Sequence, residues 1–495
     1  MARPRQVSRI VAAVAALTIL LPSQPASAHA FGLRYDLPLP LWLFLAGAGV
    51  VVVLSFVGMA LLSTGRASHH RLVLSLPAGP AGTFVAALRI GAVAMLVLVF
   101  CAASLGNEDT FSNLAPTAVW IVWWLGLAYL CALFGDVWAL INPFDSLFRW
   151  GAALLPRACL PGRRAWPAWL GRWPAALALL AFAWVEMLSE FGETPRGLAW
   201  LIGVYALATW LGMAVFGRRT WLARADVFAV FFGLIGRFGI VEGRLGAGPW
   251  PAPRRAALRW PGLGLVERRI PCRGQFAVVI VMLASVSFDG FRETPAWQAI
   301  LDAVATDMNL RPFLLWLRDG GVNLLTFIET VGLIVTPLLF AVAFLLCAGC
   351  MRACVGPQRH GTMAFAAAFA ASLVPIAIAY HLAHYLSYFL LAGQLFVPLL
   401  SDPFGWGWNL LGVPTSGIDV SVVNARMVWY VAVVAVSLGH VAGVMVAHLT
   451  AGHILSDHRH VRRSQIPMLV LMVAYTMTSL WILAQPVIVT GTELD

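Results

Sequence analysis

The stretch "LVPIAIAYHLAHYLSYFLLAGQ", residues 373–394, is the most informative about the fold. It is apolar enough for a membrane helix, yet it carries two histidines and three tyrosines. In a helix, His381, His384, Tyr385 and Tyr388 follow the spacing i, i+3, i+4 and i+7, which places them on one face. A polar face is costly in lipid unless it meets protein or a wet cavity. The stretch therefore predicts a membrane helix inside a helical bundle.

The composition of the whole chain gives the same protein class. Of its 495 residues, 60% are hydrophobic and only 11% are charged, with a mean hydropathy of +0.83. A soluble domain of this size does not have such a composition, so we expect a polytopic membrane protein. The net charge of +11 comes from arginine, because the sequence contains no lysine. These arginines sort to one side of the predicted membrane topology, so they do not indicate binding to nucleic acid.

The N-terminal residues 1–28 have the pattern of a cleaved signal peptide. A start rich in arginine precedes an apolar run at 10–21 and an A-x-A cleavage site at 26–28. Cleavage there makes His29 the first mature residue, outside the cytoplasm. Its amino group and imidazole could together chelate copper, or the histidine could simply follow the cleavage site.

Apolar runs long enough to cross a bilayer then recur along the chain. We predict ten spans, at 41–62, 84–105, 117–140, 174–190, 197–216, 275–288, 324–347, 361–390, 427–449 and 466–488. The segments on one side of these spans hold 23 arginines, and those on the other side hold six. By the positive-inside rule, the first side is cytoplasmic, which leaves both mature termini outside.

The predicted fold is thus an all-α polytopic membrane protein with about ten transmembrane helices after a cleaved signal peptide. Residues 29–495 form one transmembrane domain, and its longest cytoplasmic loop is the Arg-rich segment 217–274. Within that loop, residues 226–236 are apolar and could form a re-entrant or interfacial piece. We expect the domain to lie in the inner (plasma) membrane of a bacterium.

Several ionisable residues are predicted at the depth of the two histidines. His381 and His384 lie in the outer third of span 361–390, and Pro375 can bend the helix that carries them. Glu329 begins span 324–347 near its outer end, and Asp289 closes span 275–288. Glu186 and Glu190, in the outer part of span 174–190, are further candidates.

This set of nitrogen and oxygen donors could hold a divalent metal ion. Zn, Co, Mn or Cu would suit imidazole and carboxylate ligands. The predicted ligands are His381, His384 and Glu329, with His29 as a separate candidate at the mature N-terminus. Each carboxylate could instead be an ordinary residue in a solvated loop.

A second pattern lies in span 427–449, in "GHVAGVMVAH". Gly439, Gly443 and Ala447 form a small-x-x-x-small seam, which predicts close packing against another helix. His440, near the middle of the membrane, could hydrogen-bond across helices or have a functional role. Asp136 belongs to the segment 135–145, which ends the third span and is interpreted as a structural turn.

Much of the mature chain resembles a family of bacterial integral membrane proteins, the fenitrothion hydrolase-like proteins. The resemblance rests on "HAFGLRYDLPLPLWLFLAGAGVVVVLSFVGMALL", "FGDVWALINPFDSL", "WLGRWPAALALLAFAWVEM", "SFDGF", "LVPIAIAYHLAHYLSYFLLAGQ", "SDPFGWGWNLLG" and "SLGHVAGVMVAH", which occur in this order. It implies hydrolysis of the P–O–aryl bond of an organophosphorus triester, an apolar small molecule that partitions into the bilayer.

Such a hydrolysis needs an activated water and stabilisation of charge at the phosphoryl group. On this hypothesis the metal activates the water, Asp289 is the base or a further ligand, and Tyr385 or Tyr388 lines an aromatic pocket. We name Asp289 and Tyr385 as the catalytic candidates.

Two other function classes stay open. Polar residues at one depth and a proline-bent helix also suit a transporter of metal or small solutes. A transporter should carry polar residues along a whole path, to which His440 and Asp136 could belong, whereas an enzyme needs only the outer cluster. The third class is a membrane subunit that binds copper at His29 and delivers it to another membrane subunit.

Overall fold

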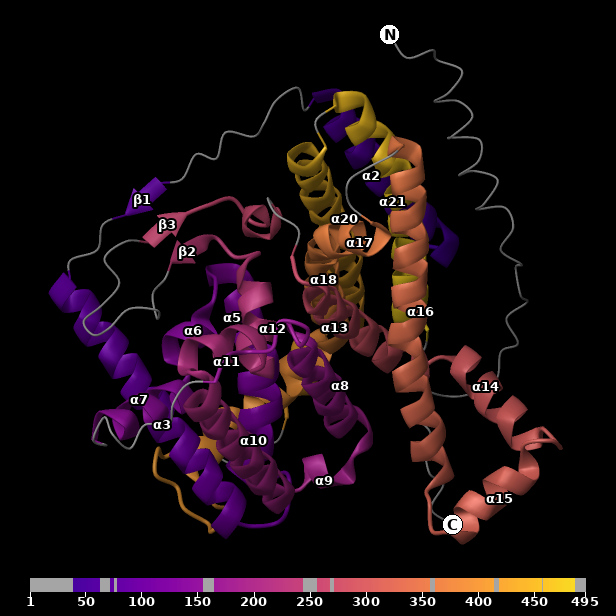
Figure 1. Ribbon diagram of the computed structural model, residues 1–495. Helices are drawn as coiled ribbons and strands as arrows, with labels where there is room; N and C mark the ends of the chain where they lie inside the picture. The colour runs from indigo at the N-terminus through magenta and orange to yellow at the C-terminus, as the bar shows by residue number, and fades with distance from the viewer. Residues whose placement is uncertain are drawn as a thin grey trace.

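The computed structural model describes residues 39–62, 72–74, 78–154, 164–243, 256–267, 271–356, 361–413, 418–455 and 457–485. The predicted signal peptide and His29 lie outside these residues, so the cleavage site and the copper hypothesis stay predictions. Within the described part, helices make up most of the chain (Figure 1). This confirms the predicted all-α architecture.

In chain order, the helices of the first half are α2 (Leu41–Leu62), α3 (Ala78–Leu105), α4 (Leu114–Pro116), the π-helix η1 (Thr117–Gly126), α5 (Leu127–Phe134), α6 (Val137–Ile141), α7 (Pro143–Leu154), α8 (Trp173–Leu188), α9 (Glu190–Glu193), α10 (Pro195–Phe216), α11 (Arg218–Arg224) and α12 (Val227–Gly236). Those of the second half are η3 (Leu263–Leu265), α13 (Arg273–Arg292), α14 (Pro295–Thr306), α15 (Arg311–Asp319), α16 (Leu324–Val355), α17 (Thr362–Phe369), η4 (Ala370–Leu373), α18 (Val374–Ala392), η5 (Gly393–Leu395), α19 (Phe396–Ser401), η6 (Val420–Val422), α20 (Ala425–Ile454) and α21 (His458–Leu483). Strands β1 (Leu72–Leu74), β2 (Val241–Gly243) and β3 (Ala256–Leu258) form a small antiparallel sheet in the order β1-β3-β2.

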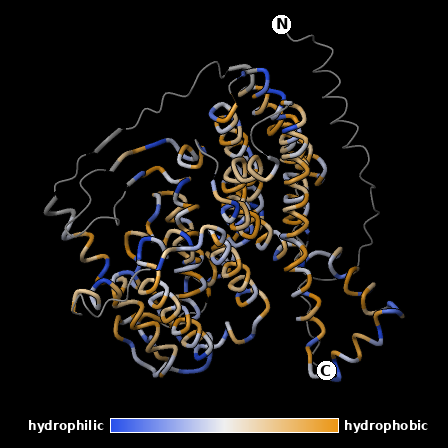
Figure 2. Tube along the Cα trace, in the orientation of Figure 1, coloured by the Kyte–Doolittle hydropathy of each residue, from blue (hydrophilic) through white to orange (hydrophobic). Residues whose placement is uncertain are grey.

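Nine segments of the described chain are long and apolar enough to cross a membrane. They are Leu41–Met59, Gly82–Leu105, Leu114–Phe134, Pro195–Phe216, Arg273–Arg292, Leu324–Val355, Thr362–Ser401, Ala425–Ile454 and Arg459–Leu483. Apolar residues run along the lengths of these helices (Figure 2). Nine of the ten predicted spans therefore correspond to such segments, and the chain is a polytopic membrane protein.

The one predicted span without such a segment, 174–190, is the shorter apolar helix α8. It has 16 residues, fewer than the about 20 that cross a bilayer without tilt or thinning. A second short apolar helix, α12, lies inside the predicted loop 217–274. Eight of its ten residues are buried, and it contacts α5, α6 and α8. The apolar piece predicted at 226–236 is therefore a half-length helix packed within the protein.

The helices α18 and α20 pack closely because small residues line their contact. A Cβ atom at Gly439 would collide with the Cβ of Ala379, and one at Gly443 would lie 2.7 Å from the carbonyl oxygen of Ser372. Neither position can therefore hold a larger residue without a shift of backbone. This confirms the predicted small-residue seam.

The predicted span 361–390 is not one continuous α-helix. The helix α17 gives way to the 3₁₀ turn η4, and α18 then begins with Pro375 in its first turn. Proline is tolerated there because the first turn of a helix has no intrahelical partner for its N–H groups. The helix that carries His381 and His384 therefore begins at this break.

Asp226 fixes the start of the buried helix α12. One carboxylate oxygen accepts the backbone N–H of Ala229 at 2.8 Å. The other accepts the Tyr205 hydroxyl at 2.9 Å and the Thr209 hydroxyl at 3.2 Å, both from α10. Asp226 is only 2% exposed, so these three donors offset the cost of burying the carboxylate.

We expect Asp226→Ala to lower the free energy of unfolding by about 3 kcal/mol, because it removes a helix cap and leaves two buried hydroxyls unpaired. Denaturant titration in detergent measures the change. The control is Asp419→Ala, since Asp419 is an exposed aspartate that caps η6. That variant should lose about 1 kcal/mol or less. Equal losses in the two variants would contradict the anchoring role of Asp226.

Candidate functional site

The centre of the candidate site is α13, the most deeply buried of the spanning helices in the described chain. It contacts α8, α16 and α18. Near its end, Gly290 lets α18 approach, because a Cβ atom there would collide with the Tyr380 hydroxyl. The polar residues that precede and follow Gly290 are therefore held against the histidine-bearing face of α18.

Asp289 is the residue that joins these helices. Its Oδ2 atom accepts the Tyr385 hydroxyl at 2.6 Å and lies 2.9 Å from Nε2 of His384. Its Oδ1 atom accepts Nε of Arg292 at 3.0 Å. Because Asp289 is only 6% exposed, a carboxylate there needs these partners to offset its desolvation.

Glu186, at the end of α8, is the second carboxyl group of the site. Its Oε1 atom accepts the indole N–H of Trp124 at 3.0 Å and lies 3.2 Å from the Tyr385 hydroxyl oxygen. A phenol has one proton, and the shorter distance favours donation to Asp289. Tyr385 thus bridges two carboxyl groups that come from helices far apart in the sequence.

Arg292 holds the ends of α8 and α13 together. Besides its ion pair with Asp289, its guanidinium donates to the backbone carbonyl of Met187 at 2.8 Å. Met187 directly follows Glu186, so this bond fixes the position of the second carboxyl group. The three helices α8, α13 and α18 therefore share one hydrogen-bonded network.

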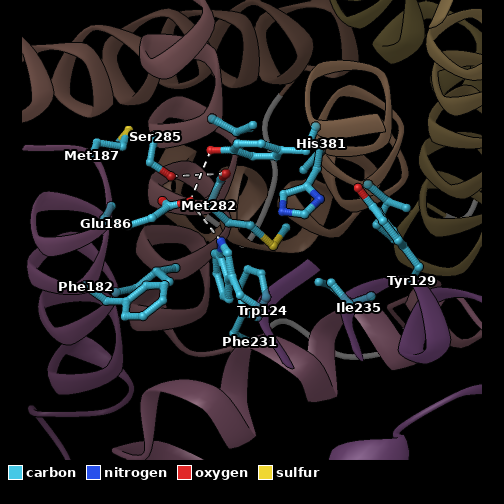
Figure 3. Close-up of a pocket in the computed structure, with 17 residues that line it drawn as sticks. Trp124, Tyr129, Phe182, Glu186, Met187, Phe231, Ile235, Met282, Ser285 and His381 are labelled. Atoms are coloured by element: carbon cyan, nitrogen blue, oxygen red, sulfur yellow. Dashed lines mark hydrogen bonds between the residues drawn. The ribbon is translucent and has the colours of Figure 1, made fainter. Parts of the chain in front are cut away.

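A small cavity lies beside this network. Its walls include Glu186, Tyr385, His381, Trp124 and Tyr129. Glu186 and His381 project into it from opposite walls (Figure 3). The cavity offers about 30 Å³ to the centres of water molecules, and about 10 to 15 Å³ on this measure is enough for one water. The space therefore suits one or two waters rather than a drug-sized ligand.

Two polar atoms in the cavity walls lack hydrogen-bond partners in the described part of the chain. They are Nε2 of His381 and the hydroxyl oxygen of Tyr129. The rings of these two residues lie 5.7 Å apart, and the ring of Tyr385 lies 4.9 Å from that of His381. Buried polar atoms without partners are rare in proteins. A water, a transferred proton or a bound molecule in the cavity would satisfy these two polar atoms.

The predicted metal ligands are only partly brought together. His384 bonds to Asp289, His381 lines the adjacent cavity, and Glu329 is a half-buried residue of α16 with no hydrogen bond to this network. Over the described ranges, no three His, Cys, Asp or Glu side chains form a group that could hold a metal ion. The donors as arranged therefore do not favour a metal centre, and metal binding stays a prediction.

The outcome for the other predicted residues is mixed. Asp289 and Tyr385 lie at the centre of the network, and their catalytic roles stay predictions. Tyr388, on the same helix, is 53% exposed and does not line the cavity. Glu190, the first residue of α9, is exposed.

The two residues proposed to extend a transport path have local partners. Asp136 caps α6 by accepting the backbone N–H of Ala139 at 2.9 Å, which supports its reading as a structural turn. Nδ1 of His440 lies 2.8 Å from the carbonyl oxygen of Val436 in its own helix, and its Nε2 has no partner in the described chain.

Sequence reasoning did not predict Trp124 or Arg292 as site residues. Trp124 belongs to the π-helix η1, and its indole N–H donates to Glu186. Nothing in the apolar run "TAVWIVWWLG" signals a π-helix. Arg292 is one of the six arginines on the predicted outer side, and its i, i+3 spacing from Asp289 is a signal for an ion pair on a helix.

Comparison with protein families and with solved structures finds no match. No protein-family model matches the chain, and no solved structure matches it significantly. The resemblance to fenitrothion hydrolases therefore stays a prediction.

Proposed function

We propose that this chain is a membrane hydrolase that cleaves apolar organophosphorus triesters, with Glu186 as the base that activates water. The observation that carries the proposal is the Glu186 side chain itself, which reaches into a water-sized cavity among membrane-spanning helices. Ionisable residues at such a depth mark functional sites by default, because their burial is costly. A base within hydrogen-bond reach of a water is the first requirement for hydrolysis.

The environments of the two carboxyl groups support different roles for them. Asp289 is paired with the cation of Arg292 and bonded to His384 and Tyr385. Glu186, by contrast, accepts the neutral indole N–H of Trp124 and lies 3.2 Å from the neutral Tyr385 hydroxyl. Asp289 is therefore better suited to position Tyr385 than to accept a proton, so Glu186 replaces Asp289 as the proposed base.

The chemistry balances without a further reactant. The water oxygen attacks phosphorus as its proton passes to Glu186, and the P–O–aryl bond breaks with its electron pair leaving on the aryloxide. The products are a dialkyl phosphate and a phenolate, which needs little help from an acid. Tyr385 is close enough to the cavity to turn its O–H toward the phosphoryl oxygen and stabilise its developing charge.

The substrate class comes from the family resemblance together with the character of the site. An uncharged aryl triester dissolves in the bilayer, so it could reach a cavity between spanning helices without crossing the aqueous phase. His381 lines the wall of the small cavity opposite Glu186 and would face the water there.

A transporter of metal or small solutes is the second candidate. The observation in its favour is that α13 carries polar clusters at both ends. At the end opposite Asp289, Gln275 donates to Glu267 at 2.9 Å and accepts from Arg172 at 2.9 Å. A path along α13 would connect these two clusters.

We expect Glu186→Gln to lower kcat for diethyl nitrophenyl phosphate by about 100-fold or more, with little change in KM, because it removes only the base. Nitrophenolate release by the chain in lipid nanodiscs measures this. Glu190→Gln is the matched control, since Glu190 is an exposed neighbour outside the cavity, and it should retain full activity.

Two outcomes would overturn the hydrolase proposal. One is a Glu186→Gln variant as active as wild type. The other is a wild-type chain with no hydrolysis that instead moves a metal ion or solute into proteoliposomes, with uptake lost in the same variant. The second result would select the transporter.

The orientation in the membrane is also part of the proposal. We place the chain in the plasma membrane of a bacterium, with the Arg-rich segments in the cytoplasm and the Asp289 end of α13 outside. Reporter fusions at residue 265 in η3 and residue 305 in α14 should then report cytoplasmic and external positions. Since α13 separates the two positions, the same side for both would show that α13 does not cross the membrane.

The metal prediction has a separate test. It expects bound metal in the purified chain, and loss of that metal in His381→Ala and His384→Ala with expression and insertion intact. Elemental analysis of the purified proteins measures this. Retention of the metal by both variants, or an active wild type without metal, would contradict the predicted ligand set and leave the Glu186 route standing.

A further inference from the structure

A second, larger space lies among α3, η1, α8 and α10. It has a volume of about 540 Å³, which is within the range of small-molecule pockets, roughly 300 to 1,000 Å³. None of its lining residues is charged. We call this space the apolar cleft.

The apolar cleft opens toward the outer surface of the helical bundle. Val122, Leu130 and Val204 line it and are also exposed, at 37%, 46% and 61%. Exposed apolar side chains on spanning helices face the acyl chains of the bilayer. A molecule dissolved in the bilayer can therefore enter the cleft without passing through water.

The walls of the cleft are rich in aromatic rings, and the polar atoms of two of them are bonded to groups outside the cleft. The Tyr205 hydroxyl donates to Asp226, and the Trp120 indole N–H donates to the carbonyl oxygen of Gly192 at 3.1 Å. The rings of Trp120, Trp123 and Phe228 thus offer their carbon faces and edges. Such a wall favours an uncharged aromatic ligand, because ring contacts add to the hydrophobic gain and no group compensates a charge.

Phe182 lines both the apolar cleft and the Glu186 cavity, and it is the one residue of the described chain that does so. It lies four residues before Glu186 on α8, so the two side chains share one helix face. Its ring packs edge-on against Trp124 at 4.5 Å and Phe228 at 5.0 Å. One aromatic side chain thus forms the partition between the space that fits a ligand and the space that fits water.

We propose that the apolar cleft binds the uncharged aryl group of a molecule drawn from the bilayer, and that Phe182 separates this group from the Glu186 cavity. The proposal of a binding site depends only on the observed cleft. Its use as the substrate chamber rests on the proposed hydrolase function, which would bring the P–O–aryl bond to the Phe182 partition.

Photolabelling of the full chain in nanodiscs tests the binding site. The probe is an uncharged trifluoromethyl phenyl diazirine, with excess diethyl nitrophenyl phosphate as competitor and mass spectrometry to locate the label. We expect saturable, competed labelling of the α8 and α10 segments that line the cleft. Lipid-facing positions elsewhere should be labelled without saturation.

Filling the cleft should remove this labelling. Ala178→Phe on α8 and Ala208→Phe on α10 place a ring in the cleft from different walls, and each should weaken labelling about tenfold or more. Leu177→Phe is the matched control, because Leu177 is 63% exposed and lies outside the lining of the cleft. The two filling variants keep the test valid if one of them fails to fold.

The outcomes separate the cleft from the hydrolase. Saturable labelling in a chain that hydrolyses nothing supports the cleft and overturns only the proposed function. Hydrolysis with an unchanged KM in both filling variants overturns the cleft as substrate chamber and leaves the hydrolase. Labelling that neither saturates nor responds to the filling variants overturns the binding site itself. Glu186→Gln should keep full labelling.

Discussion

The burial of the Asp289 carboxylate among membrane-spanning helices is the constraint on which the site depends. An uncompensated charge at this position would cost several kcal/mol. Arg292, Tyr385 and His384 supply the compensation, and they come from two helices. Arg292 also binds the end of α8, and Tyr385 also reaches Glu186. The need to satisfy one carboxylate thus orders α8, α13 and α18 around the cavity.

Small residues make this arrangement possible. Gly290 allows α18 to approach α13 at the level of Asp289, while Gly439 and Gly443 bring α20 against the other side of α18. In lipid, helix association depends on such close packing because the hydrophobic effect gives little preference between helix and acyl chain. Three residues of the polar face of α18, His381, His384 and Tyr385, lie within protein as the sequence pattern predicted, whereas Tyr388 on the same face is 53% exposed.

The sequence predicted those features that depend on distance along the chain. Apolar runs indicated the spans, and the spacing of His381, His384 and Tyr385 indicated one helix face. It could not predict that Tyr385 meets Glu186, 199 residues away, because hydropathy does not report lateral neighbours. The sequence also indicated candidate metal ligands, but it could not predict the distances between them. For the half-length helix α12 the sequence predicts only a re-entrant or interfacial piece, since ten apolar residues fit several environments.

The buried helix α13 also bears on the choice between enzyme and transporter. The polar clusters at Gln275 and Asp289 are 14 residues apart on α13, which corresponds to about 21 Å along the axis. Between them, every residue from Phe276 to Ala284 is apolar and buried. A solute or proton path along this helix would have to cross that apolar segment, whereas hydrolysis needs only the Asp289 end. The polar groups of α13 therefore favour a site that works from one side of the membrane over a path through it.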